Sequence, residues 1–415
     1  MGRATAADAT ASRRAAQRSA PRDVVASKCM LIHSTGLRSL LDTARDIATT
    51  VAAPRAEAED REACWPAETM RALANARLTA LQVPRALGGH GEGMVALAAT
   101  CEVLGQESGS VALCFGMHCV GTAVIAAKAT DAQKARYLEP IARGEHLTTL
   151  ALSEPGSGSL FLYPETGIAR RDGGYEVTGT KSFVTNGGYA DSYVISTAAV
   201  EGSSDAGAFS CVLIDRDRQG VEWLDVWRGL GMRANESRTL RLNAVRVPVE
   251  NLLGREGDQL WYIFEVIAPY FLMAMAGTYL GVAQAAFDEA RAHVATRRYA
   301  HSGELLGAAP VVSHRLGQMW TTLEATRQLV YSAAARGDAN APDALPAILA
   351  CKAAAGDTAV TVANEAMTLC GGAAYRENSR LARILRDARA SHVMAPTTDL
   401  LKTWLGRALI NLPLI

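Results

Sequence analysis

The spacing of hydrophobic and polar positions changes twice along this 415-residue chain. From residue 35 to about 144, apolar residues recur at intervals of three and four, which is typical of amphipathic helices. From 148 to about 248, short Val- and Thr-rich runs are broken by Gly, Asn and Asp, which indicates antiparallel strands in a compact sheet or barrel. The helical period then returns in the segments 260–296, 311–336, 342–370, 378–392 and 397–410.

This order predicts an α+β chain with three folded parts. We expect an N-terminal helical domain over 30–147, a middle β domain over 148–254 and a C-terminal helical bundle over 255–415. Residues 1–29 are rich in Ala, Arg and Ser and have no apolar period. We interpret them as a disordered leader, or as the product of an upstream start codon with Met30 as the true start, and an arginine-rich transit peptide is the alternative.

The segment from Val266 to Phe287 carries no charge and is long enough to cross a membrane as a helix. Within it, Gly277 and Gly281 allow another helix to approach closely. A single span between two halves of globular character would be unusual. We therefore interpret this segment as the central helix of the bundle and expect no membrane partner.

Composition narrows the possible partners. Lys and Arg total 42, as do Asp and Glu, and this balance argues against broad electrostatic binding to nucleic acid or anionic membranes. The eight cysteines are scattered, with no CxxC pair and no histidine pair at zinc spacing, so we expect no metal site. Scattered thiols in a large core are typical of a reducing compartment and favour a cytoplasmic protein.

Several segments, in chain order, match the signatures of one enzyme family. They are "LQVPRALGGHGEG" (81–93), "QKARYLEPIARGEH" (133–146), "LALSEPGSGS" (150–159), "GTKSFVTNGGYADSYVI" (179–195), "GLGMRANESRTLRLNAVRVPVENLLG" (229–254) and "LCGGAAYRENSRLARILRDAR" (369–389). The set resembles the acyl-CoA dehydrogenase family over roughly residues 35–410. The resemblance implies N-terminal helices, a middle antiparallel β barrel and a C-terminal four-helix bundle. It also implies a homotetramer with FAD between the domains and a neighbouring subunit.

The chemistry of two of these segments also suits a flavin. An isoalloxazine ring needs a face to stack on and donors at its polar edge. Ser153 offers a donor in a turn where Gly158 allows close approach, and Phe183 offers an aromatic face. Thr185 lies two residues further along the same predicted strand and would point the same way; the resemblance makes it the partner of the flavin N5. The predicted cofactor-binding residues here are Leu152, Ser153, Gly158, Ser159, Phe183, Val184 and Thr185.

The resemblance assigns four more residues to FAD. Arg297 matches an arginine that reaches the pyrophosphate held by a neighbouring subunit, although the residues after it depart from the family pattern. Gly371 and Gly372 match a glycine pair near the adenosine. Thr397 matches the threonine of a Glu-Gly-Thr segment that touches the cofactor. Without the resemblance, Arg297 would be an ordinary solvent-facing helix charge.

The family's catalytic base is missing from both positions that the resemblance indicates. Most members have a Glu where this chain has Ala395, and some have it where this chain has Phe271. A general base typically contributes about 10²–10⁴-fold to the rate, so the loss is large. The remaining ionisable candidates are weak substitutes, namely Glu236, Glu265, Tyr270 and Asp399.

Polar contacts to CoA are also missing where the resemblance places them. The aligned residues here are Leu160, Pro269 and Leu272. Either a core helix has drifted in sequence, or the site does not hold CoA in the family's usual way. In the second case the substrate would be carried by a carrier protein or would be a free hydrophobic molecule.

Three functions therefore remain open. The first is an FAD-dependent oxidoreductase that desaturates an acyl thioester with a relocated or substrate-derived base and passes electrons to an acceptor flavoprotein. The second is a flavin-dependent monooxygenase or oxidase of natural-product tailoring, which uses O₂ and needs no base for the α-proton. The third is a non-catalytic paralogue, and the intact flavin segments argue against it.

Overall fold

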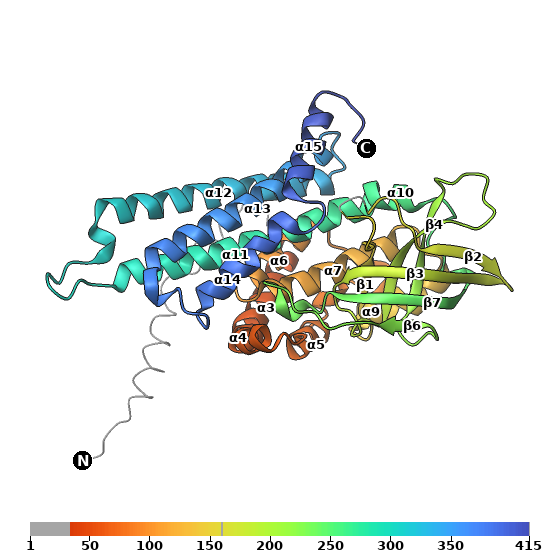
Figure 1. Cartoon of the computed structure of the whole chain (residues 1–415), viewed down its shortest axis with the longest axis horizontal. Helices are drawn as coiled ribbons and strands as arrows, with labels where there is room; N and C mark the ends of the chain where they lie inside the picture. Colours follow the sequence, from red (N-terminus) through yellow and green to blue (C-terminus); the bar gives the residue numbers. More distant parts are fainter. Residues whose placement is uncertain (1–33, 159–160, 415) are drawn as a thin grey trace, which may run out of the picture.

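The computed structural model describes residues 34–158 and 161–414, so the expected leader over 1–29 lies outside the described residues. Helices, strands and helices follow one another in the predicted order, which confirms the α+β fold class (Figure 1). The strands gather at one end of the molecule, and the long C-terminal helices extend toward the other end.

The N-terminal part consists of helices, and two of them are almost wholly buried. Helix α3 begins after Ser34, whose hydroxyl accepts a hydrogen bond from the Leu37 amide at 3.0 Å and so caps the helix. Helices α6 and α7 are apolar on all faces because other elements surround both of them: α6 packs against α3, α7, α11 and α12, and α7 packs against α6, α11 and the β domain. The α-helices here are α3 (Thr35–Ile47), α4 (Ala53–Glu62), α5 (Ala67–Asn75), α6 (Met94–Gly105), α7 (Gly109–Ala127), α8 (Asp131–Gln133) and α9 (Glu139–Arg143).

The middle part contains seven strands in the described residues, and they form two sheets. One sheet has the order β1-β4-β5 and the other β2-β3-β7-β6. The strands are β1 (Thr148–Ala151), β2 (Gly167–Arg171), β3 (Gly174–Val184), β4 (Ser192–Ala199), β5 (Phe209–Asp215), β6 (Val221–Trp223) and β7 (Arg238–Pro248). The expectation of purely antiparallel strands was wrong for one pair, because β1 and β4 run parallel. Strands β2 and β3 lie between them in sequence but belong to the other sheet, so the chain returns beside β1 in the same direction.

Strand β4 shows how the sheets are layered. Tyr193 and Ile195 point into a small core between the two sheets, whereas Val194 between them joins the large helical core. The three-stranded sheet therefore has both faces covered, one by helix α7 and one by the four-stranded sheet. This layering places the ends of β1 and β3 beside the helices.

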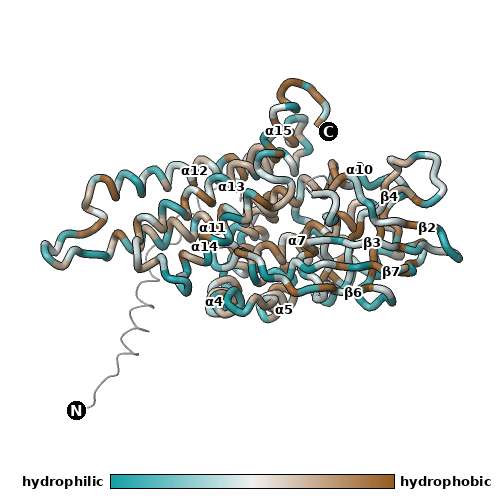
Figure 2. The backbone as a smooth tube through the Cα atoms, in the orientation of Figure 1, coloured by the Kyte–Doolittle hydropathy of each residue, from teal (hydrophilic) through white to brown (hydrophobic). Residues whose placement is uncertain are grey.

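The C-terminal part is a bundle built around one helix. Its α-helices are α10 (Gln259–Tyr262), α11 (Ala268–Thr296), α12 (Pro310–Asp338), α13 (Ala344–Cys370), α14 (Arg380–Val393) and α15 (Thr398–Leu409). Helix α11 contacts α6, α7, α12, α13 and α14, so it is the central helix that the uncharged segment predicted. Most of its apolar residues are buried. Figure 2 shows the trace of α11 running beside those of α13 and α14.

Two glycines explain how closely α11 approaches α6. A Cβ atom at Gly277 would collide with the main-chain oxygen of Ala98, and one at Gly281 would collide with that of Glu102. Three helical segments of the described chain are long and apolar enough to cross a membrane, but the window in α11 is 83% buried inside the protein. Packing within the bundle accounts for this apolar stretch.

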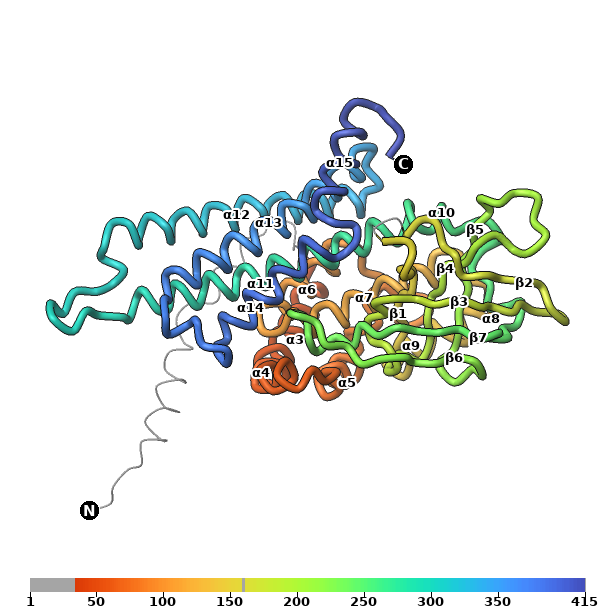
Figure 3. The backbone as a smooth tube through the Cα atoms, in the orientation of Figure 1, coloured from red at the N-terminus to blue at the C-terminus, as the bar shows by residue number. Residues whose placement is uncertain are grey.

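Helix α11 also sets the length of the bundle. It has 29 residues, so its ends are about 43 Å apart at 1.5 Å per residue. Its first turn lies beside the β domain, whereas the loop from α11 to α12 lies at the remote end of the bundle (Figure 3). Residues at the two ends of α11 therefore belong to different regions of the surface.

Candidate functional site

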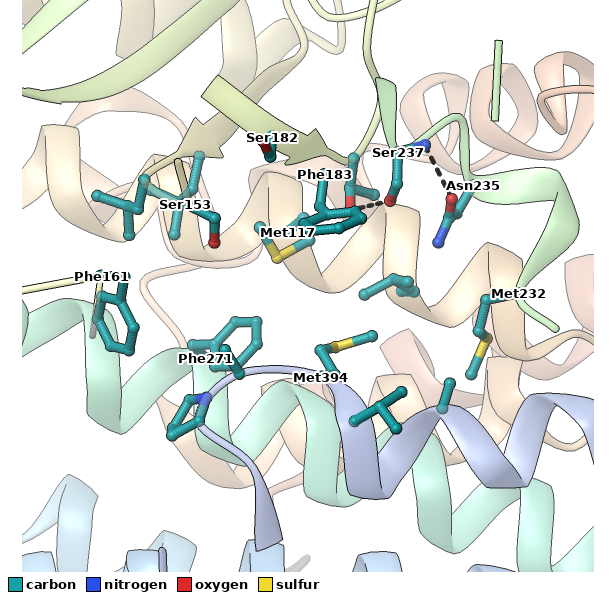
Figure 4. Close-up of a pocket in the computed structure, with 18 of the residues that line it drawn as sticks. Met117, Ser153, Phe161, Ser182, Phe183, Met232, Asn235, Ser237, Phe271 and Met394 are labelled. Atoms are coloured by element: carbon teal, nitrogen blue, oxygen red, sulfur yellow. Dashed lines mark hydrogen bonds between the residues drawn. The ribbon is translucent and has the colours of Figure 1, made fainter. Parts of the chain in front are cut away.

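A cavity of about 730 Å³ lies where the three parts of the chain meet. Figure 4 shows Met117 from α7, Phe183 from β3, Phe271 from α11 and Met394 after α14 pointing into it. Most of the lining is apolar, and the polar side chains come mainly from the β domain. The polar lining residues are Ser153, Glu154, Ser182, Thr185, Asn235 and Ser237.

The loop after β1 carries the first predicted flavin-contacting residues. Leu152, Ser153 and Gly158 all line the cavity. Gly158 has φ +53°, and no atom lies within 4 Å of the point that a Cβ would occupy there. That backbone conformation suits glycine and leaves open space for a ligand. Ser159 lies outside the described residues.

Glu154 is the one ionisable residue among the described residues that line the cavity, and its carboxylate is fully engaged. It accepts hydrogen bonds from Lys181 Nζ at 2.6 Å, from the Thr166 hydroxyl at 2.6 Å and from the main-chain amides of Glu165 and Thr166. Burial alone would raise the pKa of Glu154, but the Lys181 charge and these donors hold that pKa below its usual range. Glu154 is therefore a structural anion that fixes the loop and is not free to act as a base.

Phe183 presents an aromatic ring to the cavity from a backbone conformation that is uncommon for its type. Its φ is +55° and its side chain is 66% exposed. The register of β3 against β7 shifts between Lys181 and Val184, so a bulge rotates Phe183 outward. A flat, uncovered ring at the wall of an apolar cavity is a suitable surface for stacking another planar ring.

The same bulge corrects two expectations about the neighbouring residues. Thr185 does not continue the strand, because β3 ends at Val184, yet both Phe183 and Thr185 reach the cavity. Phe183 and Thr185 therefore do share one side, as expected, but the alternation of side chains along a strand is not the cause. The side chain of Val184 is fully buried in the small core between the sheets and does not line the cavity.

Two polar residues beside Thr185 were missed by the sequence reasoning. The Thr185 and Ser237 hydroxyls lie 3.1 Å apart, and the Ser237 amide donates to Asn235 Oδ1 at 2.9 Å (Figure 4). Both residues fall inside the matched segment 229–254, which was the available signal. Together with Thr185 they give the cavity a buried polar side opposite its apolar wall.

The apolar wall contains both positions where the family carries a base. Ala395 and Phe271 line the same cavity. The four alternative candidates do not replace them: Glu236, Glu265, Tyr270 and Asp399 are all absent from the cavity lining, and Glu265 and Asp399 are solvent-exposed. The described wall therefore offers no free carboxylate or imidazole to the cavity.

Four predicted cofactor residues do not line this cavity within the chain. Arg297 ends α11 at the remote end of the bundle and is exposed. Gly371 has φ +62°, and neither it nor Gly372 has any atom within 4 Å of an added Cβ, so the chain's own packing does not require glycine at 372. Thr397 caps α15 by accepting from the Leu400 amide, and it does not line the cavity.

The described residues fit the isoalloxazine part of FAD. Ser153 and Thr185 place hydroxyl groups on the cavity wall, Phe183 supplies an uncovered aromatic face, and Gly158 leaves room for close approach. A cavity with a few convergent polar groups in an apolar lining is typical of cofactor and substrate sites.

Comparison with known proteins supports this assignment. Models of the acyl-CoA dehydrogenase N-terminal, middle and C-terminal domains match residues 34–145, 149–245 and 272–410. An acyl-CoA dehydrogenase of Bacillus subtilis is 30% identical over 370 residues, which cover 88% of this chain and 96% of the relative.

Solved structures give the same result. Butyryl-CoA dehydrogenase from Megasphaera elsdenii superposes with a TM-score of 0.85 at 26% identity, covering 91% of this chain and 98% of that one. The prolyl acyl carrier protein oxidase AnaB shares the fold, with a TM-score of 0.81 at 22% identity and coverage of 91% and 99%. This chain belongs to the acyl-CoA dehydrogenase family and is an FAD-dependent oxidoreductase.

Proposed function

We propose that this enzyme oxidises an acyl thioester whose acyl group lies against the apolar wall of the cavity. The observation that carries this proposal is the division of the cavity into a polar, flavin-facing side at Thr185 and an apolar side at Phe271 and Ala395. A thioester placed between the two sides would have its acyl carbons beside the cofactor and away from water.

Bound FAD supplies a hydride acceptor. Thr185 and Ser153 orient the polar edge of the ring, and Phe271, Met394 and Ala395 hold the acyl chain and exclude water. In a desaturation, FAD would take the hydride of the β-carbon, and the α-carbon would also have to give up a proton. Since the described wall has no free base and excludes water, that proton would pass to a basic group carried by the substrate.

We propose that the acyl group is carried either by CoA or by a carrier protein. Pro269 and Leu272 are buried in the bundle and do not line the cavity. Their apolar character therefore reflects helix packing and does not indicate whether CoA binds. AnaB, which shares the fold, is described as a prolyl acyl carrier protein oxidase, and this motivates carrier-protein thioesters as substrates beside CoA esters.

Anaerobic mixing of the holoprotein with acyl thioesters tests the proposal. A substrate should bleach the oxidised flavin absorbance in a concentration-dependent way, and paired CoA and carrier-protein forms of the same acyl group would identify the carrier. If no thioester of a broad panel bleaches the flavin while dithionite does, the proposal is wrong.

A second candidate function is oxygen chemistry, as a monooxygenase or oxidase. The apolar wall without a base favours it, because activation of O₂ at a reduced flavin needs a cavity that excludes water rather than an α-proton base. Photoreduced holoprotein mixed with oxygenated buffer distinguishes the two functions. Fast reoxidation that puts one oxygen atom of O₂ into a product, or that releases H₂O₂, supports this candidate, whereas slow reoxidation favours electron transfer to an acceptor flavoprotein.

We further propose a homo-oligomer, with a homotetramer as the expected form. Arg297 follows the far end of a helix about 43 Å long and cannot reach the cavity of its own chain, and Gly371 and Gly372 do not line that cavity either. A second copy whose remote end meets this cavity would bring them to the rest of the FAD. The exposed apolar residues of α12, including Val311 and Trp320, offer surface for such packing.

A further inference from the structure

The segment between β6 and β7 presents one aromatic side chain to the cavity. Leu224, Val226 and Leu230 of this segment are exposed, whereas Trp227 is half-buried and lines the cavity. No matched signature pointed to this residue. The indole therefore differs from its neighbours in facing the site rather than solvent.

The indole is held in place by a chain of hydrogen bonds. Trp227 Nε1 donates to the Met232 carbonyl oxygen at 2.9 Å. The Met232 amide donates to Asp387 Oδ1 at 2.7 Å, from a backbone with φ +50°. Beside it, Gly231 packs so closely on α14 that a Cβ would collide with the Arg386 carbonyl oxygen. The position of the indole is thus fixed by α14.

Trp227 meets Phe183 at the cavity wall in an edge-to-face arrangement. The two ring centroids are 6.2 Å apart and the ring planes meet at 89°. Because the planes are perpendicular, a flat ligand that stacks on one ring meets the other ring at its side. Phe183 and Trp227 together form a corner that fits a planar ring system.

We propose that Trp227 is a cofactor-contacting residue that borders the isoalloxazine ring beside Phe183. The hydrogen bonds through Met232 and Asp387 also join this contact to α14, whose Ala390 and Val393 line the acyl side of the cavity. The cofactor contact and part of the acyl wall are therefore positioned by the same helix.

The test uses the holoprotein and spectroscopy of the flavin band. Trp227→Phe should change the visible circular dichroism of bound FAD, because an indole beside the ring is replaced by a smaller ring. Trp227→Leu should raise the FAD dissociation constant roughly three- to tenfold, measured from the fluorescence of FAD released on dilution.

Trp223→Phe is the matched control. Trp223 lies in β6, packs on Tyr193 with ring centroids 5.4 Å apart, and does not line the cavity. It should leave the flavin spectrum and the FAD dissociation constant unchanged. Wild-type flavin circular dichroism in Trp227→Phe would overturn the proposal, and this outcome stands even if Trp227→Leu fails to fold.

Discussion

Lys352 Nζ donates a hydrogen bond of 3.0 Å to the carbonyl oxygen of Pro396, the residue that follows Ala395 at the cavity wall. The same amine donates to the Ser391 carbonyl oxygen at 3.0 Å, and the side chain has no exposed surface. Helix α13 therefore holds both ends of the turn that replaces the family's base-carrying segment. Burial lowers the pKa of Lys352 to about 8, against the attraction of Asp357.

Lys352→Met should destabilise the protein, most strongly at alkaline pH. Loss of the amine leaves two buried carbonyl groups without their donor, at a cost of about 1–3 kcal/mol. Between pH about 8 and 10.5 the unfolded chain keeps a proton on Lys352 that the folded chain has lost. The unfolding free energy of the wild type therefore rises with pH in this window relative to the variant.

Denaturant titrations at pH 7 and pH 9.5 measure this difference. Lys134→Met, at a half-exposed lysine paired with Asp131, should show no such pH-dependent gap. A gap between wild type and Lys352→Met that is constant across the two pH values would contradict the prediction.

Glu59→Gln should stabilise the protein at neutral and alkaline pH. Burial raises the pKa of Glu59 from 4.5 to about 7, and its Oε2 atom has no hydrogen-bond partner among the described residues. The folded state holds this proton more tightly than the unfolded state, so wild-type stability falls as pH rises from 4.5 to 7. Removing the charge should add up to about 3 kcal/mol at pH 8, because each unit by which the pKa rises is worth about 1.4 kcal/mol and solvent screening reduces the total.

Thermal or urea unfolding of Glu59→Gln across pH 4.5–8 checks this. The stabilisation should shrink toward pH 4.5, where wild-type Glu59 is protonated in the folded state. Glu57→Gln, at an exposed position of the same helix, serves as the control and should change little. Equal stabilisation by both variants would show that burial of Glu59 is not the cause.

Restoring a carboxylate at the wall should accelerate proton abstraction. Ala395→Glu combined with Pro396→Gly places a Glu at the position that the family uses and removes the ring that constrains the turn. Anaerobic flavin reduction by a simple acyl-CoA ester should become at least about 10²-fold faster. Ala390→Glu, which adds the same charge to the same wall, is the control. No acceleration in the double variant relative to this control would mean that the missing base does not limit the reaction.

The position of Arg297 leads to a prediction about FAD sites that are shared between two copies of the chain. Arg297→Ala should lower FAD content even though Arg297 is distant from the cavity of its own chain. Thr185→Ala should also lower the FAD content, because Thr185 lines the cavity. Co-expression of the two variants should recover FAD in a fraction of the sites, because some sites then combine an intact Thr185 with an intact Arg297 from another copy. Failure of the mixture to exceed either variant alone would argue that each site is built within one chain.

The sequence by itself determined the fold class and much of the site. Helical and strand periods are local properties, so the order of helices, strands and helices could be read from residue spacing. The matched segments located Ser153, Phe183 and Thr185, which the structure brings to one cavity. They also showed that Ala395 stands where most of the family has a carboxylate, because the type of residue at a matched position can be seen in the sequence alone.

Only the tertiary structure decided which side chains meet. The bulge in β3 turned Phe183 outward and buried Val184, and strand alternation cannot predict such a shift because it depends on pairing with β7. Trp227 and Lys352 carry no local signal. Trp227 is held by Met232, whose amide in turn donates to Asp387 of α14, and Lys352 donates to the Pro396 carbonyl; Asp387 and Pro396 lie far along the chain from these partners. Such long-range contacts follow from how the helices and sheets pack, and the hydrophobic pattern of a single segment does not encode them.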